Sequence, residues 1–149
     1  MRASTVYDSS LIQLPKTYNQ KGNITAINNL EGIIPFTIDR VYYLYDIPGG
    51  EGRGGHAHKS LKQLIIAASG SFALTLADGT TKQTFNLSKP YFGLYMPAGL
   101  WRELHNFSSS AICLVLASEK YDEDDYIRSE QEFNRYKQNH DSSAIRRSG

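Results

Sequence analysis

The chain has 149 residues, a formal net charge of +1 and one cysteine, Cys113, which has no second cysteine to pair with. This length is typical of a single domain whose core needs no disulfide, and an unpaired cysteine fits a reducing cytoplasm. The near-neutral charge gives no reason to expect nucleic acid or a membrane surface as a partner. No apolar run reaches the ~20 residues of a membrane span. We expect a cytoplasmic protein with one domain over 1–138 and a flexible polar tail over 139–149.

Short stretches rich in aromatic and β-branched residues alternate with turns that contain Gly or Pro, which is the pattern of an all-β protein. The clearest is a hairpin over 71–87, where two alternating runs flank Asp78 and Gly79, a strong turn signal. The other predicted strands lie, in chain order, at 23–28, 36–47, 63–68, near the start of 91–104, and at 111–119.

After the last predicted strand the sequence turns acidic and loses the period of two. Acidic residues followed by Ile127, Phe133 and Tyr136 predict a C-terminal helix over 121–138 that lies on the strands. Many short strands at this spacing predict a small β-barrel or jelly roll of two sheets with a short C-terminal helix. Barrels of this size hold one ligand in the mouth.

The stretch "GEGRGGHAHKSLKQLIIAASG", residues 50–70, carries the first candidate functional residues. His56 and His58 are two positions apart, so on a strand both imidazoles lie on the same face. The sequence resembles the two cupin motifs in its spacing. The first motif corresponds to Gly50, His56, His58, Gln63 and Gly70, and the second to Pro97, Gly99, Arg102 and Asn106.

The resemblance to cupins extends to the spacing but not to the metal ligands. Metal-binding cupins place His, His, Glu and His in the positions held here by His56, His58, Gln63 and Arg102. Gln is a weak neutral ligand, and Arg stays protonated and offers no lone pair. The two imidazoles that remain are fewer ligands than a stable zinc or iron site uses. We therefore expect no metal and no other cofactor.

Three stretches carry a closer resemblance: "RVYYLYDIPGGEGRGGHAHKSLKQ", "GLYMPAGLWRELHNFS" and "VLASEKYDEDDYIRSEQEF". They resemble the sugar-nucleotide 3,4-ketoisomerases, also called dTDP-4-oxo-6-deoxy-D-glucose 3,4-oxoisomerases, over residues 5–136. The resemblance implies a small cupin barrel without metal, a homodimer with exchanged N-terminal strands, and a dTDP-linked keto sugar as the substrate. It also implies a 3-oxo product that an aminotransferase converts to a 3-amino sugar of bacterial O-antigens, S-layers or other surface glycans.

The residues agree with this chemistry, because moving a ketone from C4 to C3 is a tautomerisation through an enediol. Imidazoles that titrate near neutrality suit both proton transfers. We expect His58 to be the main acid or base and His56 to orient the substrate or share the proton. One face of strand 36–47 should line the cavity, and we favour Tyr43 as a catalytic residue, with Tyr45 on the same face as a binding residue.

Three further residues are predicted to bind the substrate. Arg53 resembles the arginine that the family uses for the pyrophosphate, Gln63 should bond the sugar or a histidine, and Arg102 should reach the cavity. Members of the family differ in the configuration that they create at C4, and some have His where this chain has Arg102. An imidazole there could protonate C4 from its own side, whereas an arginine could not. We therefore expect the gluco product, dTDP-3-oxo-6-deoxy-D-glucose, rather than the galacto epimer.

Two alternatives stay open at this point. A sugar-nucleotide 3,5-epimerase would share the fold but normally uses a His–Asp pair and a separate tyrosine acid, and the sequence has no clear partner Asp for the histidines. A cupin that binds a sugar nucleotide without acting on it would keep the same motifs.

Overall fold

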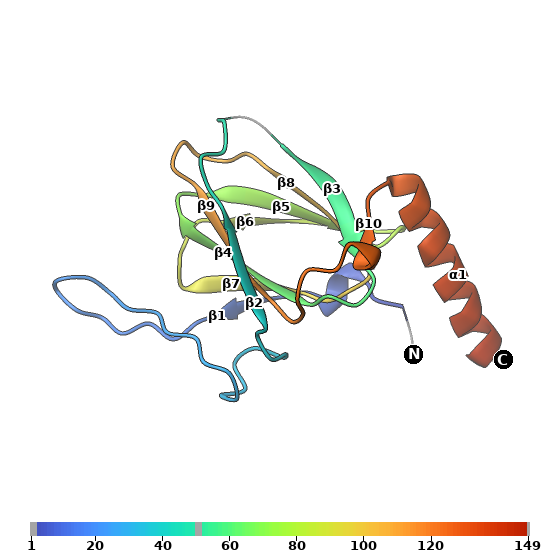
Figure 1. Cartoon of the computed structure of the whole chain (residues 1–149), viewed down its shortest axis with the longest axis horizontal. Coiled ribbons are helices and arrows are strands. Elements are labelled where there is room, and N and C mark those ends of the chain that lie inside the picture. Colours follow the sequence, from blue (N-terminus) through green and yellow to red (C-terminus); the bar gives the residue numbers. More distant parts are fainter. Residues whose placement is uncertain (1–2, 50–51, 149) are drawn as a thin grey trace.

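The computed structural model describes residues 3–49 and 52–148, without the side chains of residues 53–54 and 141–148. Two five-stranded antiparallel sheets face each other and enclose the core (Figure 1). The first sheet has the strand order β1 (Ser10–Gln13), β7 (Phe92–Met96), β4 (Gln63–Ser69), β9 (Ile112–Ala117) and β2 (Arg40–Leu44). The second has the order β10 (Tyr126–Ile127), β3 (Arg53–His58), β8 (Trp101–His105), β5 (Phe72–Ala77) and β6 (Lys82–Leu87). The predicted all-β barrel with a C-terminal helix is confirmed.

Alternation along the strands decides which residues enter the barrel. On β4, for example, Ile65 and Ala67 join the cluster between the sheets, whereas Leu64 and Ile66 pack on the outer side of the first sheet. The inner cluster is formed mainly by buried leucines, with phenylalanines, isoleucines and smaller apolar side chains. One end of the barrel holds the polar residues of the site, so the same alternation that builds the core also places the functional side chains.

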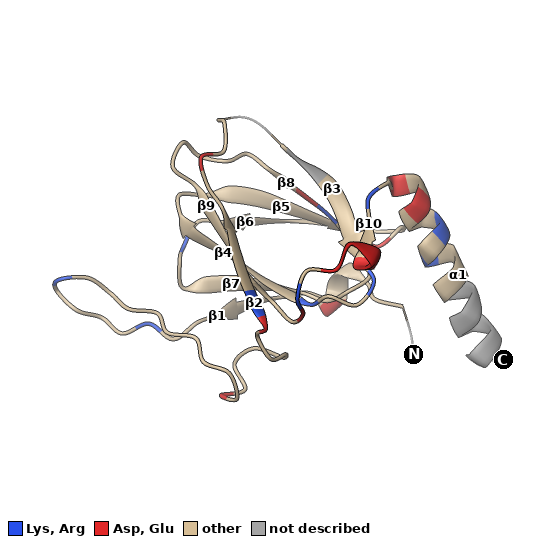
Figure 2. Ribbon diagram, in the orientation of Figure 1, with Lys and Arg blue, Asp and Glu red and all other residues tan. Residues whose placement is uncertain are grey.

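The segment that follows β9 differs from the helix predicted over 121–138. A 3-10 turn, η2 (Glu123–Asp125), is capped by Asp122 and leads into β10, which pairs with β3. Of the acidic run that favoured a helix start, Asp122 caps this turn and the next three residues form it, where Figure 2 shows a red ribbon. The helix α1 begins at Glu130 and continues to Ser148, so regular structure reaches into the part predicted as a tail. The flexibility of residues 139–149 stays a prediction.

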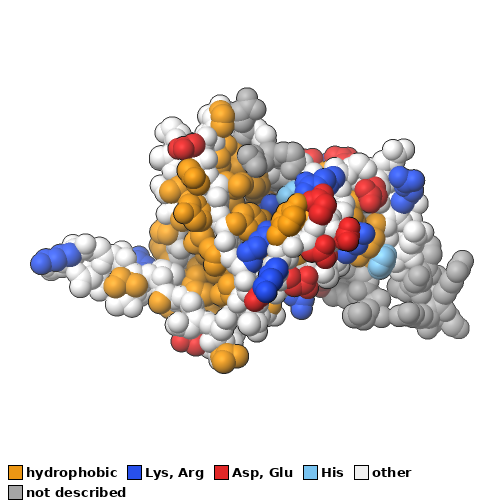
Figure 3. Space-filling view, in the orientation of Figure 1, with side chains coloured by type: hydrophobic (Ala, Val, Ile, Leu, Met, Phe, Trp, Pro, Cys, Tyr) orange, Lys and Arg blue, Asp and Glu red, His pale blue; other side chains and the backbone are white. Residues whose placement is uncertain are grey.

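The N-terminal part contains less strand than expected. Residues 15–28 run out from the barrel and return (Figure 1), and the strand predicted at 23–28 is reduced to one bridge between Thr17 and Ile24. Hydrophobic side chains gather on the molecular face around β2 (Figure 3). Within the part of the chain that the structure describes, no helix has the length and apolar character needed to span a membrane.

One buried lysine connects the helix to the barrel. Lys137, near the middle of α1, donates from Nζ to the carbonyl oxygens of Ser4 at 2.6 Å and of Gly99 at 2.9 Å. The backbone N–H of Gly99 in turn donates to the carbonyl of His58 at 2.7 Å. The helix, the N-terminal segment and the turn between β7 and β8 are therefore joined next to the histidine strand.

Candidate active site

A cavity of about 530 Å³ opens at the polar end of the barrel, between β2 of the first sheet and β3, β8 and β10 of the second. Its lining combines arginine, histidine and tyrosine with two leucines. The residues are Arg40, Tyr42, Leu44, Gly52, His56, Arg102, Leu104, Tyr126 and Arg128. Three arginines without an acidic residue in this lining suit an anionic ligand.

His56 lies on the cavity wall beside Arg102. The two residues are directly opposite each other in the β3–β8 pair, and the Nε–H of Arg102 donates to Nε2 of His56 at 3.1 Å. Burial, the Arg102 charge and His58 lower the pKa of His56 from its ordinary 6.5 to about 3. His56 is therefore neutral at pH 7, and because Nε2 accepts a hydrogen bond, its proton is on Nδ1.

His58 lies deeper, with 2% of its surface exposed. Its Nδ1 is 3.0 Å from Oδ2 of Asp125, and its Nε2 is buried without a hydrogen-bond partner among the described residues. Burial and the Arg102 charge lower the pKa of His58 to about 4, although the hydrogen bond and charge of Asp125 act in the opposite direction. The two imidazoles meet edge to face, with ring centroids 5.0 Å apart. The shared face predicted for them is confirmed.

Asp125 was missed by the sequence analysis, which found no acidic partner for the histidines. Burial raises the pKa of its carboxyl, but hydrogen bonds from Ser60 and His58 outweigh this and lower the pKa overall. Asp125 lies in the stretch "YDEDDYIR", whose acidic residues were interpreted as the start of a helix. The lack of a partner Asp therefore no longer argues against a 3,5-epimerase.

The prediction that Tyr43 and Tyr45 line the cavity is wrong. Their side chains are 57% and 61% exposed on the outer face of β2 and its extension, and they contact each other. The opposite face carries Tyr42 and Leu44 into the cavity. Alternation along β2 requires one face of the strand to point into the barrel. Both faces carry tyrosine, so the residue types alone could not show which face that is.

Tyr42 occupies the position that was assigned to Tyr43. Its hydroxyl accepts from Nε2 of Gln63 at 2.9 Å and from Nη2 of Arg102 at 3.3 Å. Oε1 of Gln63 and Nη1 of Arg102 are buried and have no hydrogen-bond partner among the described residues. Arg102 reaches the cavity as expected, whereas Gln63 bonds Tyr42 and not a histidine. Each keeps one polar atom available for a ligand, and their role in binding the substrate stays a prediction. The backbone of Arg53 lies opposite Leu104, but its side chain is outside the described residues.

Two further arginines at the cavity were not predicted. The guanidinium of Arg128 lies 4.2 Å from the ring centroid of Tyr126 and bonds the Glu123 carboxylate at 2.7 and 2.8 Å. The guanidinium of Arg40 lies 4.8 Å from the ring centroid of Tyr42. Both arginines keep a fixed charge at the cavity and lie over aromatic faces, which orient a guanidinium.

The donor set does not resemble a metal centre. Among the side chains that the structure describes, which end at residue 140, no three from His, Cys, Asp or Glu gather as ligands of one ion. Arg102 stands in the fourth ligand position of the cupin motif and is already bonded to His56. That the protein works without metal or another cofactor stays a prediction.

Comparison with known proteins decides the family. Residues 7–138 match the family described as FdtA: WxcM-like, C-terminal. The chain belongs to this family. It is 42% identical over 129 residues to the TDP-4-oxo-6-deoxy-alpha-D-glucose-3,4-oxoisomerase of Aneurinibacillus thermoaerophilus, covering 87% of this chain and 92% of the relative. The predicted resemblance to the 3,4-ketoisomerases is confirmed.

Solved structures of the family share the fold closely. The WlaRB TDP-quinovose 3,4-ketoisomerase of Campylobacter jejuni is 40% identical, with a TM-score of 0.82 over 87% of this chain and 99% of that one. QdtA, a sugar 3,4-ketoisomerase from Thermoanaerobacterium thermosaccharolyticum solved with TDP, is 35% identical, with a TM-score of 0.86 over 90% and 97% of the two chains.

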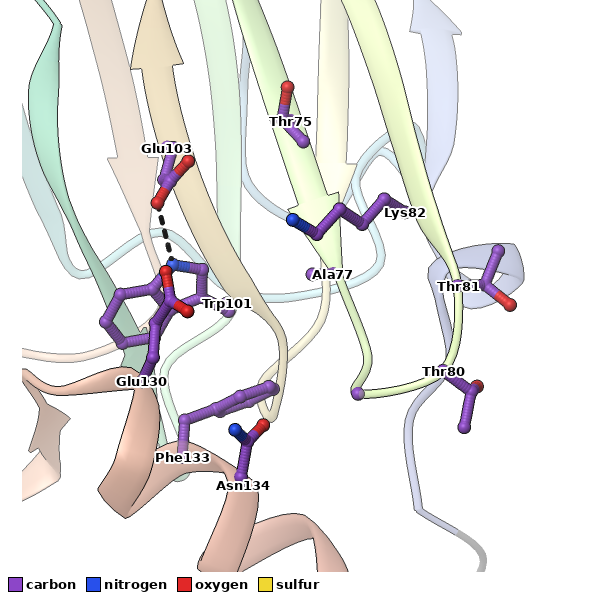
Figure 4. A pocket seen from close by; sticks show the side chains of 11 residues that line it. Thr75, Ala77, Thr80, Thr81, Lys82, Trp101, Glu103, Glu130, Phe133 and Asn134 are labelled. Atoms are coloured by element: carbon purple, nitrogen blue, oxygen red, sulfur yellow. Dashed lines mark hydrogen bonds between the residues drawn. The ribbon is translucent and has the colours of Figure 1, made fainter.

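This member of the family also has a smaller cavity of about 170 Å³ on the outer side of β8, under the first turns of α1 (Figure 4). Trp101 and Phe133 form its apolar part. Glu103, whose carboxylate accepts from the Trp101 indole at 3.2 Å, lies with Glu130 and Lys82 at its polar edge. Charges of both signs surround this space, in contrast to the arginines of the barrel mouth.

Proposed function

We propose that this protein is a TDP-sugar 3,4-ketoisomerase that converts dTDP-4-oxo-6-deoxy-D-glucose to the 3-oxo isomer. Its family membership and the activities for which its relatives are named support this. The observation that carries the proposal is the pair of neutral imidazoles, with His56 on the wall of a cavity whose lining includes three arginines and His58 buried directly behind it. Neutral imidazoles accept protons, and fixed cations bind the diphosphate and the negative charge that forms on the sugar.

The reaction balances without an oxidant or reductant. A base takes the proton from C3, the C3–C4 double bond forms, and the C4 carbonyl oxygen becomes an enolate oxygen. Protonation of that oxygen gives the enediol. Loss of the proton from the C3 hydroxyl, with delivery of a proton to C4, then leaves the ketone at C3. The protein must therefore supply a base, an acid and a donor for one oxyanion.

We assign contact with the sugar to His56 and a supporting position to His58, which reverses the order expected from the sequence. His56 is on the cavity wall, whereas His58 is almost fully buried behind it. The lone pair of His56 is held by Arg102 in the free protein. A substrate oxygen that takes the Nε–H of Arg102 also frees this lone pair. The same movement of the Arg102 hydrogen bond therefore stabilises the oxyanion and makes His56 available as the base.

The neighbouring side chains suit the remaining parts of the substrate. Gln63 and Arg102 offer an acceptor and a donor to the sugar from deep in the barrel. Arg40 and Arg128, together with the predicted Arg53, provide cations for the diphosphate at the mouth. The thymidine then extends outward, past Tyr126.

The gluco product stays our proposal for the stereochemistry. Arg102 carries no proton that it can give to C4, so C4 is protonated from the side of the imidazoles. Of two solved Campylobacter jejuni relatives, WlaRB, which is 40% identical, is named for TDP-quinovose, and quinovose is 6-deoxyglucose, whereas WlaRA, which is 30% identical, is named for TDP-fucose.

We also propose a homodimer with exchanged N-terminal strands, active in the cytoplasm in the supply of amino sugars for bacterial surface glycans. The projecting segment 15–28 and the apolar side chains that the chain leaves exposed at Leu11, Ile24 and Val41 support the dimer. Light scattering after gel filtration tests it, and a monomer at micromolar concentration would contradict it.

Isotope exchange tests the activity itself. The protein is mixed with dTDP-4-oxo-6-deoxy-D-glucose in D2O, and the sugar is followed by NMR. Deuterium at C3 or C4 with a migrating ketone is expected. Deuterium at C5 would instead indicate a 3,5-epimerase, and binding without any exchange would indicate a cupin that only holds the nucleotide.

A further inference from the structure

We infer that Asp125 is a positioning residue of the proposed reaction, which fixes the tautomer of His58 so that Nδ1 carries the proton and Nε2 the lone pair. The inference rests on the proposed function for its catalytic meaning. Its structural part, the tautomer, stands independently of the activity and is measured separately below.

The groups around the Asp125 carboxylate are hydrogen-bond donors, so both of its oxygens act as acceptors. Oδ1 accepts from the backbone N–H of Ser60 at 2.7 Å and lies 2.8 Å from the Ser60 hydroxyl. Oδ2 accepts from the backbone N–H of Leu61 at 3.3 Å and lies 3.0 Å from Nδ1 of His58. A carboxylate that receives two backbone N–H groups is favoured in its ionised form. Its partner nitrogen on His58 must then be the donor, and the proton is on Nδ1.

The backbone holds this carboxylate in place from both sides. The N–H of Lys59 donates to the Asp125 carbonyl at 2.9 Å, and the N–H of Asp125 donates to the Asp122 carbonyl at 3.1 Å. The next residue, Tyr126, pairs with His58 in the β10–β3 ladder, and their ring centroids are 4.4 Å apart. The segment from η2 to β10 therefore holds the imidazole between a carboxylate and an aromatic ring.

Nε2 of His58 has no hydrogen-bond partner among the described residues, so it can accept a proton during the reaction. A buried lone pair without a donor costs stability, and such groups in a protein often mark a functional position. Nε2 is in that state, beside His56 and on the opposite side of the ring from Asp125. When His58 receives a proton there, the imidazolium must exist near positive charge. The charged or titratable groups that face it are Arg102, Asp125, Arg40, His56 and Tyr126.

Of these groups Asp125 is the one carboxylic acid, so it stabilises the protonated form of His58 against two arginines. The same principle operates wherever a carboxylate orients a catalytic imidazole and stabilises its cation. Without the carboxylate, the buried His58 would resist protonation more strongly, and its ring could adopt the other tautomer. In the unmodified protein, Asp125 therefore acts on the reaction through His58 and does not touch the sugar.

The test compares Asp125→Asn with Asp124→Asn, a neighbouring aspartate whose side chain is exposed. The amide that replaces the Asp125 carboxylate can donate to Nδ1, which moves the His58 proton to Nε2. We expect kcat to fall about 100-fold with KM within about threefold, since binding does not involve Asp125. The Asp124→Asn control should stay within about twofold. A kcat for Asp125→Asn within about threefold of the unmodified enzyme would refute the inference.

The second readout needs no turnover. Long-range ¹H–¹⁵N NMR of the ¹⁵N-histidine-labelled protein distinguishes the two tautomers of a neutral imidazole. We expect His58 with its proton on Nδ1 at pH 7, and the opposite tautomer in Asp125→Asn. A proton on Nε2 of His58 in the unmodified protein would overturn the inference even if the isomerase activity is present. Absence of isomerase activity with the expected tautomer would instead contradict the proposed function alone.

Discussion

The two sides of strand β8 face two cavities of different character. Arg102 and Leu104 point into the barrel mouth, whereas Trp101 and Glu103 line the smaller cavity under α1 (Figure 4). On the outer side the polar groups bond one another: the Trp101 indole to Glu103, and the hydroxyl of Thr75 to His105 at 2.8 Å.

The inner side is different because some of its buried polar atoms have no hydrogen-bond partner. The buried side-chain atoms without a partner in the described part of the chain are His58 Nε2, Gln63 Oε1 and Arg102 Nη1, and all belong to the barrel mouth. The comparison teaches that cavity shape alone does not identify a site here. The site is identified by buried polar atoms without a hydrogen-bond partner and by a lining whose charges have one sign. The following predictions compare inner residues with outer ones.

The largest effect is expected for His56→Asn. Loss of the imidazole to which we assign contact with the sugar should lower kcat about 1,000-fold, because general acid–base catalysis contributes on this scale. The matched outer change, His105→Asn, should keep turnover within about threefold, since His105 bonds Thr75 on the other side of the sheet. Rates are measured by NMR of the sugar. Similar losses in both variants would show that the effect comes from the fold.

His58→Asn then tests the order of the two histidines. If His56 is in contact with the sugar and His58 supports it, the loss for His58→Asn should be smaller, about 100-fold. The same NMR assay measures both variants. A larger loss for His58→Asn than for His56→Asn would restore the order expected from the sequence.

Arg102→His should change the product as well as the rate. An imidazole in this position can give a proton to C4 from its own side, so the fraction of galacto product should rise. Glu103→Gln, the adjacent outer change, should leave the product ratio unaltered. NMR coupling constants at C4 measure the ratio. A pure gluco product from Arg102→His would show that this position does not control stereochemistry.

Tyr42→Phe should lower kcat/KM about tenfold, because its hydroxyl joins Gln63 and Arg102 and its removal leaves buried partners unpaired. Tyr43→Phe, one residue away on the outer face, should stay within about twofold. The two values come from the same steady-state assay. Equal losses would mean that both faces of β2 contribute to the site, for example through a second subunit.

The smallest expected effect is a change of stability with pH. Burial and Arg102 lower the pKa of His56 to about 3 and of His58 to about 4, below the 6.5 of an unfolded histidine. The unfolded chain thus binds these protons first, so their contribution to the free energy of unfolding is intact above pH 6.5 and is lost as the pH falls toward 4. Urea unfolding between about pH 7.5 and 5 measures this, with His105→Asn as the control. A His56→Asn variant that keeps the full pH dependence would contradict it.

Much of the site followed from spacing, because alternation on a strand is strict. It placed His56 and His58 on one face, and the cupin spacing brought Gln63 and Arg102 to them from β4 and β8. The tyrosine was chosen wrongly because both faces of β2 carry tyrosine.

Asp125 could not be found by the same reasoning. An acidic run before apolar residues predicts a helix start, but here tertiary pairing with β3 turned it into a 3-10 turn and a two-residue strand. A long-range pairing of this kind has no local signal. The projecting segment 15–28 is a similar case, since its alternating residues form one bridge within the chain and no strand.

The buried Lys137 makes the C-terminal helix important for the active site, although the helix does not line the barrel mouth. Shortening the protein before this residue would remove the donor to the carbonyls of Ser4 and Gly99, and Gly99 is bonded to the backbone of His58. For protein engineering, the permissible end of the molecule therefore lies after Lys137. A fusion partner or tag attached nearer to the barrel would disturb the strand that carries both histidines.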